Sequence, residues 1–374
     1  MKKTIHLPGL NGLRAIAAFG VVFSHLALQL KSFGVNPYLF GINPDGNPNG
    51  LMLATYGVSI FFSLSGFLIT YLLLHERAIK PINIKNFYIR RILRIWPLYY
   101  LYFLIVIITL EFFKIDFPKT SVWFYLFLSA NIPFLINQNI LLVDHYWSLG
   151  IEEQFYALWP WLMKISKQNI LKLSVRLLIG LLLLKLLFRL VEIKYSYSLP
   201  LNILSIFRFQ CMLIGAVGAM LYYKNNKILI SIATNIITQI ISWIIIFLVI
   251  LNIYHLVSVL DQEIVCVIAV FLIIGQSNKK NRIINLDIKP LDFLGKISYG
   301  IYVIHPIIIF FIAKLWGDID SPFLKNYFVI FGTVSITTIF VAYISYNYFE
   351  KLFLKLKSNY TTVKSSSTKD LRDI

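Results

Sequence analysis

The chain has 374 residues, of which 58% are hydrophobic and only 14% are charged, and its formal net charge is +18. Its mean hydropathy is +0.74, whereas an average soluble domain has about 25% charged residues. This composition indicates an integral membrane protein and argues against a soluble domain. Cys211 and Cys266 both lie in apolar segments, so they predict neither a disulfide framework nor a metal site.

Ten apolar segments are each close to the roughly 20 residues that a helix needs to cross a bilayer. The first of them has no cleavage site behind it, which argues against a removable signal peptide. The apolar segment 123–143 is interrupted by Pro133 and polar residues, so we expect a loop or an interfacial segment there. The sequence therefore predicts an all-α polytopic integral membrane protein with about ten transmembrane helices, at residues 10–30, 51–75, 93–113, 146–163, 170–191, 203–223, 228–250, 256–276, 293–313 and 327–349.

The distribution of basic residues predicts the topology of these helices. With both termini in the cytoplasm, most of the 35 lysines and arginines fall on inner segments, as the positive-inside rule requires. An eleventh span at residues 123–143 would remove this bias. The net charge is thus a topology signal, which favours a lipid bilayer and no nucleic acid as the partner.

The first predicted helix carries Arg14 and His25 within an otherwise apolar segment. Eleven residues at about 1.5 Å and 100° per residue place the two side chains on one face, roughly 16 Å apart. Ionisable residues inside a membrane span are costly, so they suggest a functional site. The structural alternative is an arginine that extends to the interface and a histidine that a neighbouring helix satisfies.

Two small residues, Ser65 and Gly66, lie in the second predicted span and permit close approach by another helix or by a threaded ligand. At the inner end of the third span, Arg90, Arg91 and Arg94 fall within about one turn. Guanidinium groups match phosphate oxygens, so this run favours a clamp for a phosphorylated cytosolic ligand. A positive-inside anchor, or a contact with anionic lipid, is the alternative.

The fourth predicted span starts outside, which places Glu152 and Glu153 roughly 10 Å below the outer surface. Adjacent helical residues point about 100° apart, so the two carboxylates are not expected to serve the same site. Arg208 lies about five residues into the sixth span. Glu152, Arg208 and His25 are therefore predicted at one depth, in the outer half of the membrane.

Two further groups of polar residues could form sites; we reject the first as a catalytic triad and keep the second as a candidate. Asp144, His145 and Ser148 are too close together in the sequence for a hydrolase triad, and no Gly-x-Ser-x-Gly turn is present. Ser298, Tyr302 and His305 share a broad face of the ninth span. His305 precedes Pro306, so a kink with a satisfied imidazole is the alternative there.

Taken together and in this order, these motifs resemble the family 3 membrane acyltransferases, which O-acetylate cell-surface and exported polysaccharides in bacteria. The resemblance covers residues 7–353, expected to be a membrane-embedded acyltransferase domain, and residues 358–374 are expected to be a polar, disordered cytoplasmic tail. Some members carry an extra C-terminal hydrolase-like domain, which we do not expect in a chain of this length. The matching pieces are Arg14 with His25, residues 61–66, the 90–97 arginine run, residues 147–156, Arg208 before Gly215, residues 298–306 and residues 345–350.

The resemblance implies acetyl-CoA as a cytosolic co-substrate, no metal, a carbohydrate acceptor, and the bacterial inner membrane as the location. The donor would dock at Arg90, Arg91, Arg94 and Arg14, and its pantetheine arm would pass Ser65, Gly66, Ser298 and Tyr302. His25 would then act as general base or transient acyl carrier. Glu152 or Glu153 would orient the imidazole, and Arg208 would stabilise the oxyanion or bind the sugar. The alternative is a transporter or flippase without chemistry, in which the same charges form a relay.

Overall fold

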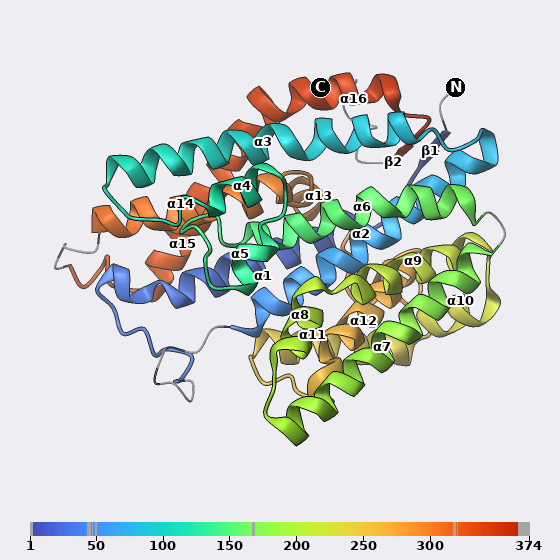
Figure 1. Cartoon of the computed structure of the whole chain (residues 1–374), viewed down its shortest axis with the longest axis horizontal. Coiled ribbons are helices and arrows are strands. Elements are labelled where there is room, and N and C mark those ends of the chain that lie inside the picture. The colour runs from blue at the N-terminus through green and yellow to red at the C-terminus, as the bar shows by residue number, and fades with distance from the viewer. Residues whose placement is uncertain are drawn as a thin grey trace.

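The computed structural model describes residues 3–42, 46, 48, 51–166, 169–316, 319 and 321–365, and this part of the chain is almost entirely helical (Figure 1). Its α-helices are α1 (Leu10–Leu28), α2 (Met52–Ile79), α3 (Ile84–Phe112), α4 (Ser121–Leu126), α5 (Asn131–Leu135), α6 (Tyr146–Ile165), α7 (Ile170–Tyr195), α8 (Leu199–Phe207), α9 (Phe209–Tyr223), α10 (Lys227–Ala233), α11 (Ile236–Ile250), α12 (Asp261–Gly275), α13 (Lys289–Lys296), α14 (Ser298–Trp316), α15 (Tyr327–Ile344) and α16 (Lys351–Lys357). Short 3₁₀ turns cover Leu30–Phe33, Ser258–Leu260 and Ser358–Tyr360, a π-helical turn covers Ser345–Glu350, and the strands are β1 (Lys3–Ile5) and β2 (Val363–Ser365).

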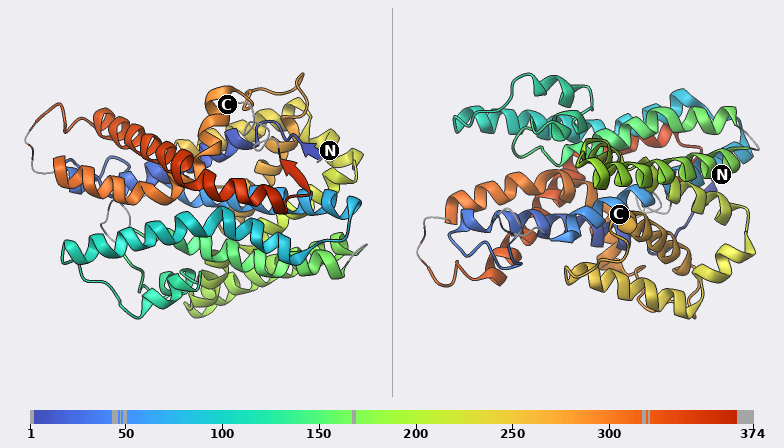
Figure 2. Two further views of the ribbon diagram at one scale, coloured as in Figure 1. Left: turned by 90° about the horizontal axis from the view of Figure 1, so that it is seen from above. Right: turned by 60° about the horizontal axis from the view of Figure 1, so that its bottom comes forward.

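The helix α2 lies at the centre of the bundle, packed against α1, α9 and α12 (Figures 1 and 2). Its crossing with α9 depends on two glycines. A Cβ on Gly66 would press into the backbone oxygen of Met212, and one on Gly215 would press into that of Ser63. Because small residues let membrane helices approach closely, Gly66 serves helix packing, which was the alternative interpretation of this motif.

Six helical segments of the described chain are long and apolar enough to cross a membrane, namely Leu10–Leu28, Met52–Ile79, Ile84–Phe112, Leu199–Tyr223, Ser298–Trp316 and Tyr327–Tyr360. The pair α10 and α11 is bent by 58° and makes a seventh if it is counted as one span. The other three predicted spans coincide with α6, α7 and α12, but α6 and α7 carry several charged residues and α12 has 15 residues. The helical membrane class is therefore confirmed, while the count of ten remains a prediction.

The helix α7 carries a lysine within its apolar part, and this lysine forms a buried ion pair with α12. Lys185 Nζ of α7 lies 2.6 Å from Glu263 Oε1 of α12, and Gln210 Nε2 of α9 donates to the same oxygen at 2.9 Å. Paired charges are tolerated in the membrane interior where unpaired ones are costly. The acidic start of the predicted 256–276 span is thus compatible with a buried helix.

The segment before α6 forms the short helices α4 and α5 and several turns, in agreement with the loop or interfacial segment predicted at residues 123–143. Tyrosines of α3 hold it in place: Tyr99 donates to Tyr125 O at 2.8 Å, and Tyr102 donates to Leu142 O at 2.9 Å. The segment leads into His145, the residue before α6. The loop therefore has a defined conformation that positions His145.

The two ends of the described chain pair with each other. β1 and β2 form a parallel pair in which Lys3 lies opposite Val363 and Ile5 opposite Ser365, at the right-hand end of the bundle in Figure 1. Residues 358–365 thus form a 3₁₀ turn and a strand, where the sequence predicts a disordered tail. Residues 366–374 of that predicted tail lie outside the described residues.

Candidate active site

Arg14 and His25 lie on the same helix, α1, but in the walls of two different cavities. Arg14 lines an inner cavity of about 80 Å³, whereas His25 lines an outer cavity of about 570 Å³. The inner cavity lies towards the β1–β2 end of the bundle, because α1 begins next to β1. One continuous helix therefore connects two hollows, with a cation in the first and an imidazole in the second.

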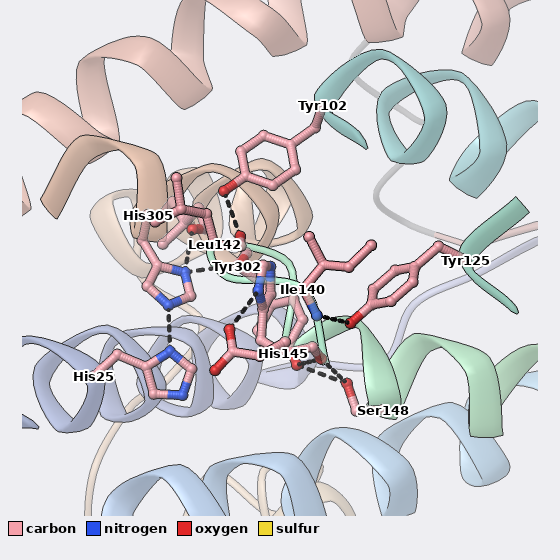
Figure 3. A network of polar contacts seen from close by, with 11 residues as sticks. His25, Tyr102, Tyr125, Ile140, Leu142, His145, Ser148, Tyr302 and His305 are labelled. Atoms are coloured by element: carbon pink, nitrogen blue, oxygen red, sulfur yellow. Dashed lines mark hydrogen bonds and ion pairs between the residues drawn. The ribbon is translucent and has the colours of Figure 1, made fainter. Parts of the chain in front are cut away.

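The ring of His25 is bonded to a second histidine, His305 of α14 (Figure 3). His25 Nδ1 lies 2.9 Å from His305 Nε2. His305 Nδ1 lies 2.8 Å from Tyr302 O, and because a carbonyl can only accept, this nitrogen carries the proton. In the neutral pair, His305 Nε2 is then the acceptor and His25 Nδ1 the donor. This assignment leaves His25 Nε2 unprotonated on the side of the ring away from His305, as a base must be.

Pro306 explains why the carbonyl of Tyr302 is free to hold His305. In an α-helix this oxygen would accept from the amide of the residue four positions later, and that residue is Pro306, which has no N–H. His305, which is fully buried, takes the vacant acceptor instead. The His-Pro pair is therefore both a satisfied imidazole, as the structural alternative proposes, and the partner of His25.

A third imidazole, that of His145, completes the outer cluster. Its ring centroid lies 5.3 Å from that of His305 and 6.4 Å from that of His25, and its Nδ1 lies 3.8 Å from Asp144 Oδ1. Ser148 Oγ donates to the backbone oxygen of His145 and not to its ring, so the three residues do not form a hydrolase triad. The sequence motif contained His145, but only the folded loop places it here.

The hydroxyl groups of Tyr302 and Ser148 link this cluster to the inner cavity. They lie 2.6 Å apart, and Tyr302 also donates to His145 O at 2.9 Å. Both residues line the inner cavity. The Tyr302–Ser148 pair therefore borders the inner cavity and contacts His145 of the outer cluster.

The inner cavity is bordered by three guanidinium groups, those of Arg14, Arg91 and Arg94. The guanidinium of Arg91 lies over the rings of Phe87 and Tyr156, 5.9 and 5.4 Å from their centroids. Other predicted residues share the cavity wall: Ser65, Glu152, Ser298 and Tyr302. The structure thus brings together most of the residues that the sequence assigned to a donor site.

Arg90 differs from its two neighbours in the arginine run. Its Nη2 lies 2.7 Å from Glu76 Oε2, and its Nη1 donates to Tyr360 O at 2.8 Å. Both side chains of this ion pair are almost completely buried. Arg90 therefore joins α2, α3 and the C-terminal segment, and unlike Arg91 and Arg94 it does not line the inner cavity.

Lys357 of α16 is a cation that the sequence did not single out. It lines a small cavity of about 40 Å³ together with Arg90 and Arg91, and it lies within electrostatic reach of Arg94 and Arg14. It belongs to the basic stretch at the end of the chain, so its approach to the arginines depends on the fold of α16 against α3.

The two predicted carboxylates, those of Glu152 and Glu153, do not contact His25. Glu152 accepts a hydrogen bond from Tyr156 and lines the inner cavity. Its depth differs from the predicted one because His145, seven residues earlier and about 10 Å away along the helix axis, is the residue at the level of His25. Glu153 accepts from Trp96 Nε1 at 3.1 Å, which directs it towards α3.

Arg208 is also held apart from the imidazole cluster. It ends α8 with a positive φ of 44°, and its guanidinium donates to Thr55 O at 3.0 Å and Ser205 O at 2.7 Å. It lies 5.1 Å above the ring of Trp147. These contacts fix the break between α8 and α9 against α2. The residue hydrogen-bonded to His25 is His305. From the sequence, His305 could be either part of the site or a satisfied imidazole beside a proline kink.

The described residues contain no group of three or more His, Cys, Asp or Glu side chains arranged to hold a metal ion. Within the histidine cluster, His25 is hydrogen-bonded to His305, and His305 Nδ1 is hydrogen-bonded to the carbonyl of Tyr302.

Comparison with known proteins gives the family directly. The chain belongs to the family 3 acyltransferases, because the family's sequence profile, described as an acyltransferase domain, matches residues 7–347. Among curated proteins, O-acetyltransferase OatA of Staphylococcus aureus (strain NCTC 8325 / PS 47) is 27% identical over 82% of this chain and 51% of its own length. A protein of Staphylococcus aureus (strain COL) named "Putative O-acetyltransferase" is 27% identical over 95% of this chain and 58% of its own length.

The chain thus spans a little over half the length of the curated relatives it matches. No solved structure matches it. The family predicted from the motifs is confirmed: the chain carries the acyltransferase domain of that family, and its described residues contain six helices long and apolar enough to cross a membrane.

Proposed function

We propose that this acyltransferase moves an acetyl group from cytosolic acetyl-CoA to a hydroxyl of a cell-surface or exported polysaccharide, across the bacterial inner membrane. The observation that carries the proposal is the placement of Arg14 and His25 on α1. Arg14 lies in a cation-lined inner cavity, and His25 lies in a larger outer cavity. The names of the relatives, which are O-acetyltransferases, support the acetyl group.

The donor end is the inner cavity. Guanidinium groups bind phosphate oxygens in pairs, and those of Arg14, Arg91 and Arg94 line this cavity, with Lys357 within electrostatic reach of all three. The pantetheine arm would extend past Ser65 and Ser298 towards Tyr302. Arg14 and His25 are roughly 16 Å apart along α1, a length comparable to that arm, so the two residues would hold opposite ends of one donor.

The acceptor end is the outer cavity. Its volume of about 570 Å³ is within the range of small-molecule sites and accommodates a sugar unit. Gln29, Ser32 and Asp144 line it together with His25, and such polar groups can exchange hydrogen bonds with sugar hydroxyls.

The chemistry is assigned to His25 Nε2. As a general base, this nitrogen takes the proton of the acceptor hydroxyl while the hydroxyl oxygen bonds to the thioester carbonyl carbon. The carbon–sulfur bond then breaks, and the leaving thiolate takes the proton from the imidazolium. As an acyl carrier, the same nitrogen would bond to the carbonyl carbon first, and the CoA thiolate would leave as the carbon–sulfur bond breaks. The hydroxyl oxygen would then bond to that carbon as the carbon–nitrogen bond breaks, and the hydroxyl proton would go to the thiolate. In both routes His305 holds the tautomer that leaves Nε2 free.

The remaining candidates, Glu152, Glu153 and Arg208, bind the donor or position helices and do not act on His25. Glu152 belongs to the donor end, where its carboxylate faces the same cavity as Arg14. Glu153 and Arg208 position α6 and α8 through their bonds to Trp96 and to backbone carbonyls. We place both termini in the cytoplasm, a proposal that the positive-inside distribution supports and with which the pairing of β1 and β2 agrees.

The test is an assay of thiol release from acetyl-CoA by the purified protein, together with acetyl transfer to surface glycan. We expect His25→Ala to lower transfer by about 10²–10⁴-fold, the usual contribution of a general base, or more if His25 carries the acyl group. His6→Ala is the matched control, because His6 is exposed and contacts Asp287 outside both cavities. A transporter without chemistry would release no thiol, and near-normal transfer by His25→Ala at equal expression would contradict the mechanism.

A further inference from the structure

A second basic cavity, which the proposed reaction does not use, lies at the β1–β2 end of the bundle. Its volume is about 860 Å³, and α2, α6, α7 and α9 or their ends contribute to it. Its rim carries four cations, Arg77, Lys80, Lys164 and Lys224, and Leu74 and Met220 lie beneath them. Both of these apolar side chains are buried. The cavity thus combines a cationic rim with an apolar floor.

This cavity is separate from the donor site because it is on another side of α2. Leu74 and Arg77 of α2 face it, whereas Leu73 and Glu76 face the small cavity beside Arg90 and Arg91. Successive residues of a helix point about 100° apart, so the two hollows are on different helix faces. A ligand in one leaves the other open.

The charged side chains at the rim are all positive. No carboxylate is among the described residues that line the cavity. Arg77 Nη1 donates to Met163 O at 3.3 Å, which holds its guanidinium at the junction of α2 and α6. A positive-inside bias alone would distribute lysines over the inner surface. Here the cations surround a hollow between helices, the arrangement that recognises an anionic head group.

The lower part of the cavity points to a ligand with an apolar tail. The cavity is lined by Ile170 and Leu171 at the start of α7. Leu177, seven residues after Ile170 and so on the same side of the helix, is exposed. An exposed apolar helix face in a membrane protein faces lipid. Acyl chains could therefore extend from the cavity along α7, while a phosphate at the rim meets the four cations.

We propose that this cavity binds an anionic phospholipid of the inner leaflet. The lipid phosphate is held by Arg77, Lys80, Lys164 and Lys224, and the acyl chains pack on the apolar floor and along α7. Binding joins α2 and α6, the helices that carry Ser65 and Glu152 of the proposed donor site. A ligand that binds only the folded state stabilises it, so the lipid raises the stability of this helix junction whether or not acetyl-CoA is the donor.

The experiment measures thermal unfolding of the purified full chain in a neutral detergent during titration with phosphatidylglycerol. Phosphatidylcholine, inorganic phosphate and CoA are titrated in parallel. The test variant is Lys164→Gln/Lys224→Gln, whose lysines are exposed, so we expect it to fold. The matched control is Lys279→Gln/Lys280→Gln, which removes two exposed lysines from a loop that does not line the cavity.

We expect phosphatidylglycerol to raise the unfolding temperature of the wild type and of the control, and phosphatidylcholine to raise it much less. The Lys164→Gln/Lys224→Gln protein should bind phosphatidylglycerol about 30-fold more weakly, which corresponds to about 2 kcal/mol at roughly 1 kcal/mol per charge. Arg77→Gln should show a loss in the same direction. CoA also fits the proposed donor site, so its shift should be the same in the test variant as in the wild type. Equal shifts with both lipids, an unchanged phosphatidylglycerol affinity in the test variant, an equal response to inorganic phosphate, or a CoA response that the test variant loses would overturn the proposal.

Discussion

Replacing His305 with leucine tests the centre of the proposed mechanism without touching His25 itself. In the structure, His305 Nε2 accepts the Nδ1 proton of His25 at 2.9 Å. Leucine has a similar volume but no acceptor, so the Nδ1–H of His25 loses its partner. The ring can recover a partner only if its proton moves to Nε2, and then the base is no longer available.

The size of the effect follows from the cost of an unsatisfied buried donor. That cost is about 1–3 kcal/mol, and each 1.36 kcal/mol changes a rate tenfold. Losing the favoured tautomer should therefore lower kcat about 5- to 150-fold. The KM for acetyl-CoA should stay near its wild-type value, because the donor phosphates bind at the other end of α1.

The assay is steady-state acetyl transfer by purified protein at saturating acceptor, with donor concentration varied and the unfolding temperature recorded for each variant. His305→Gln is the matched variant, since its amide oxygen offers an acceptor near the position of Nε2, and it should recover most of kcat. If His305→Leu keeps kcat within about twofold of wild type, or if His305→Gln is as slow as His305→Leu, His305 does not hold the tautomer of His25.

Three further predictions concern the donor end. Arg91→Ala and Arg94→Ala should each raise the KM for acetyl-CoA about 10- to 150-fold, the range for a hydrogen bond to a charged group, and a change confined to kcat would favour an anchor role instead. Arg90→Ala should lower the unfolding temperature, because it leaves Glu76 buried and unpaired at a cost of about 3–5 kcal/mol; an unchanged temperature with weaker donor binding would return Arg90 to the clamp. Arg14→Lys keeps the charge and loses the fork, so titration calorimetry should show weaker acetyl-CoA binding while transfer persists at high donor. If neither Arg14→Lys nor Arg14→Ala changes donor affinity, the threaded-donor hypothesis is wrong at its inner end.

Properties of single helices could be predicted from the sequence. The apolar segments predicted the membrane class and located helices that the structure contains. Helical periodicity placed Arg14 and His25 on one face of the first helix, and the order of the motifs predicted the acyltransferase family. These predictions succeed because spacing along a helix is set by local backbone geometry, which does not depend on neighbouring helices.

Contacts between helices were decided by the tertiary structure. Each residue of error in a helix boundary shifts the expected depth by about 1.5 Å, while a hydrogen bond tolerates only a few tenths of an ångström. An error of two or three residues is therefore enough to exchange one partner for another. Glu152 was expected at the depth of His25 because the outer ends of the helices were counted from one plane, whereas the structure has His145, seven residues before Glu152, beside the His25–His305 pair.

The same limit explains the arginine run and the glycine of α2. Sequence spacing grouped Arg90 with Arg94, but the partner of Arg90 is Glu76, a carboxylate 14 positions earlier on another helix. Gly66 was compatible with a channel or with a helix crossing, and the approach of Met212 on α9 decided for the crossing. The sequence by itself determined which side chains share a face of one helix. Which face meets which neighbour depends on how the helices tilt and slide against one another, because packing between membrane helices is set by shape over many residues and not by any single motif.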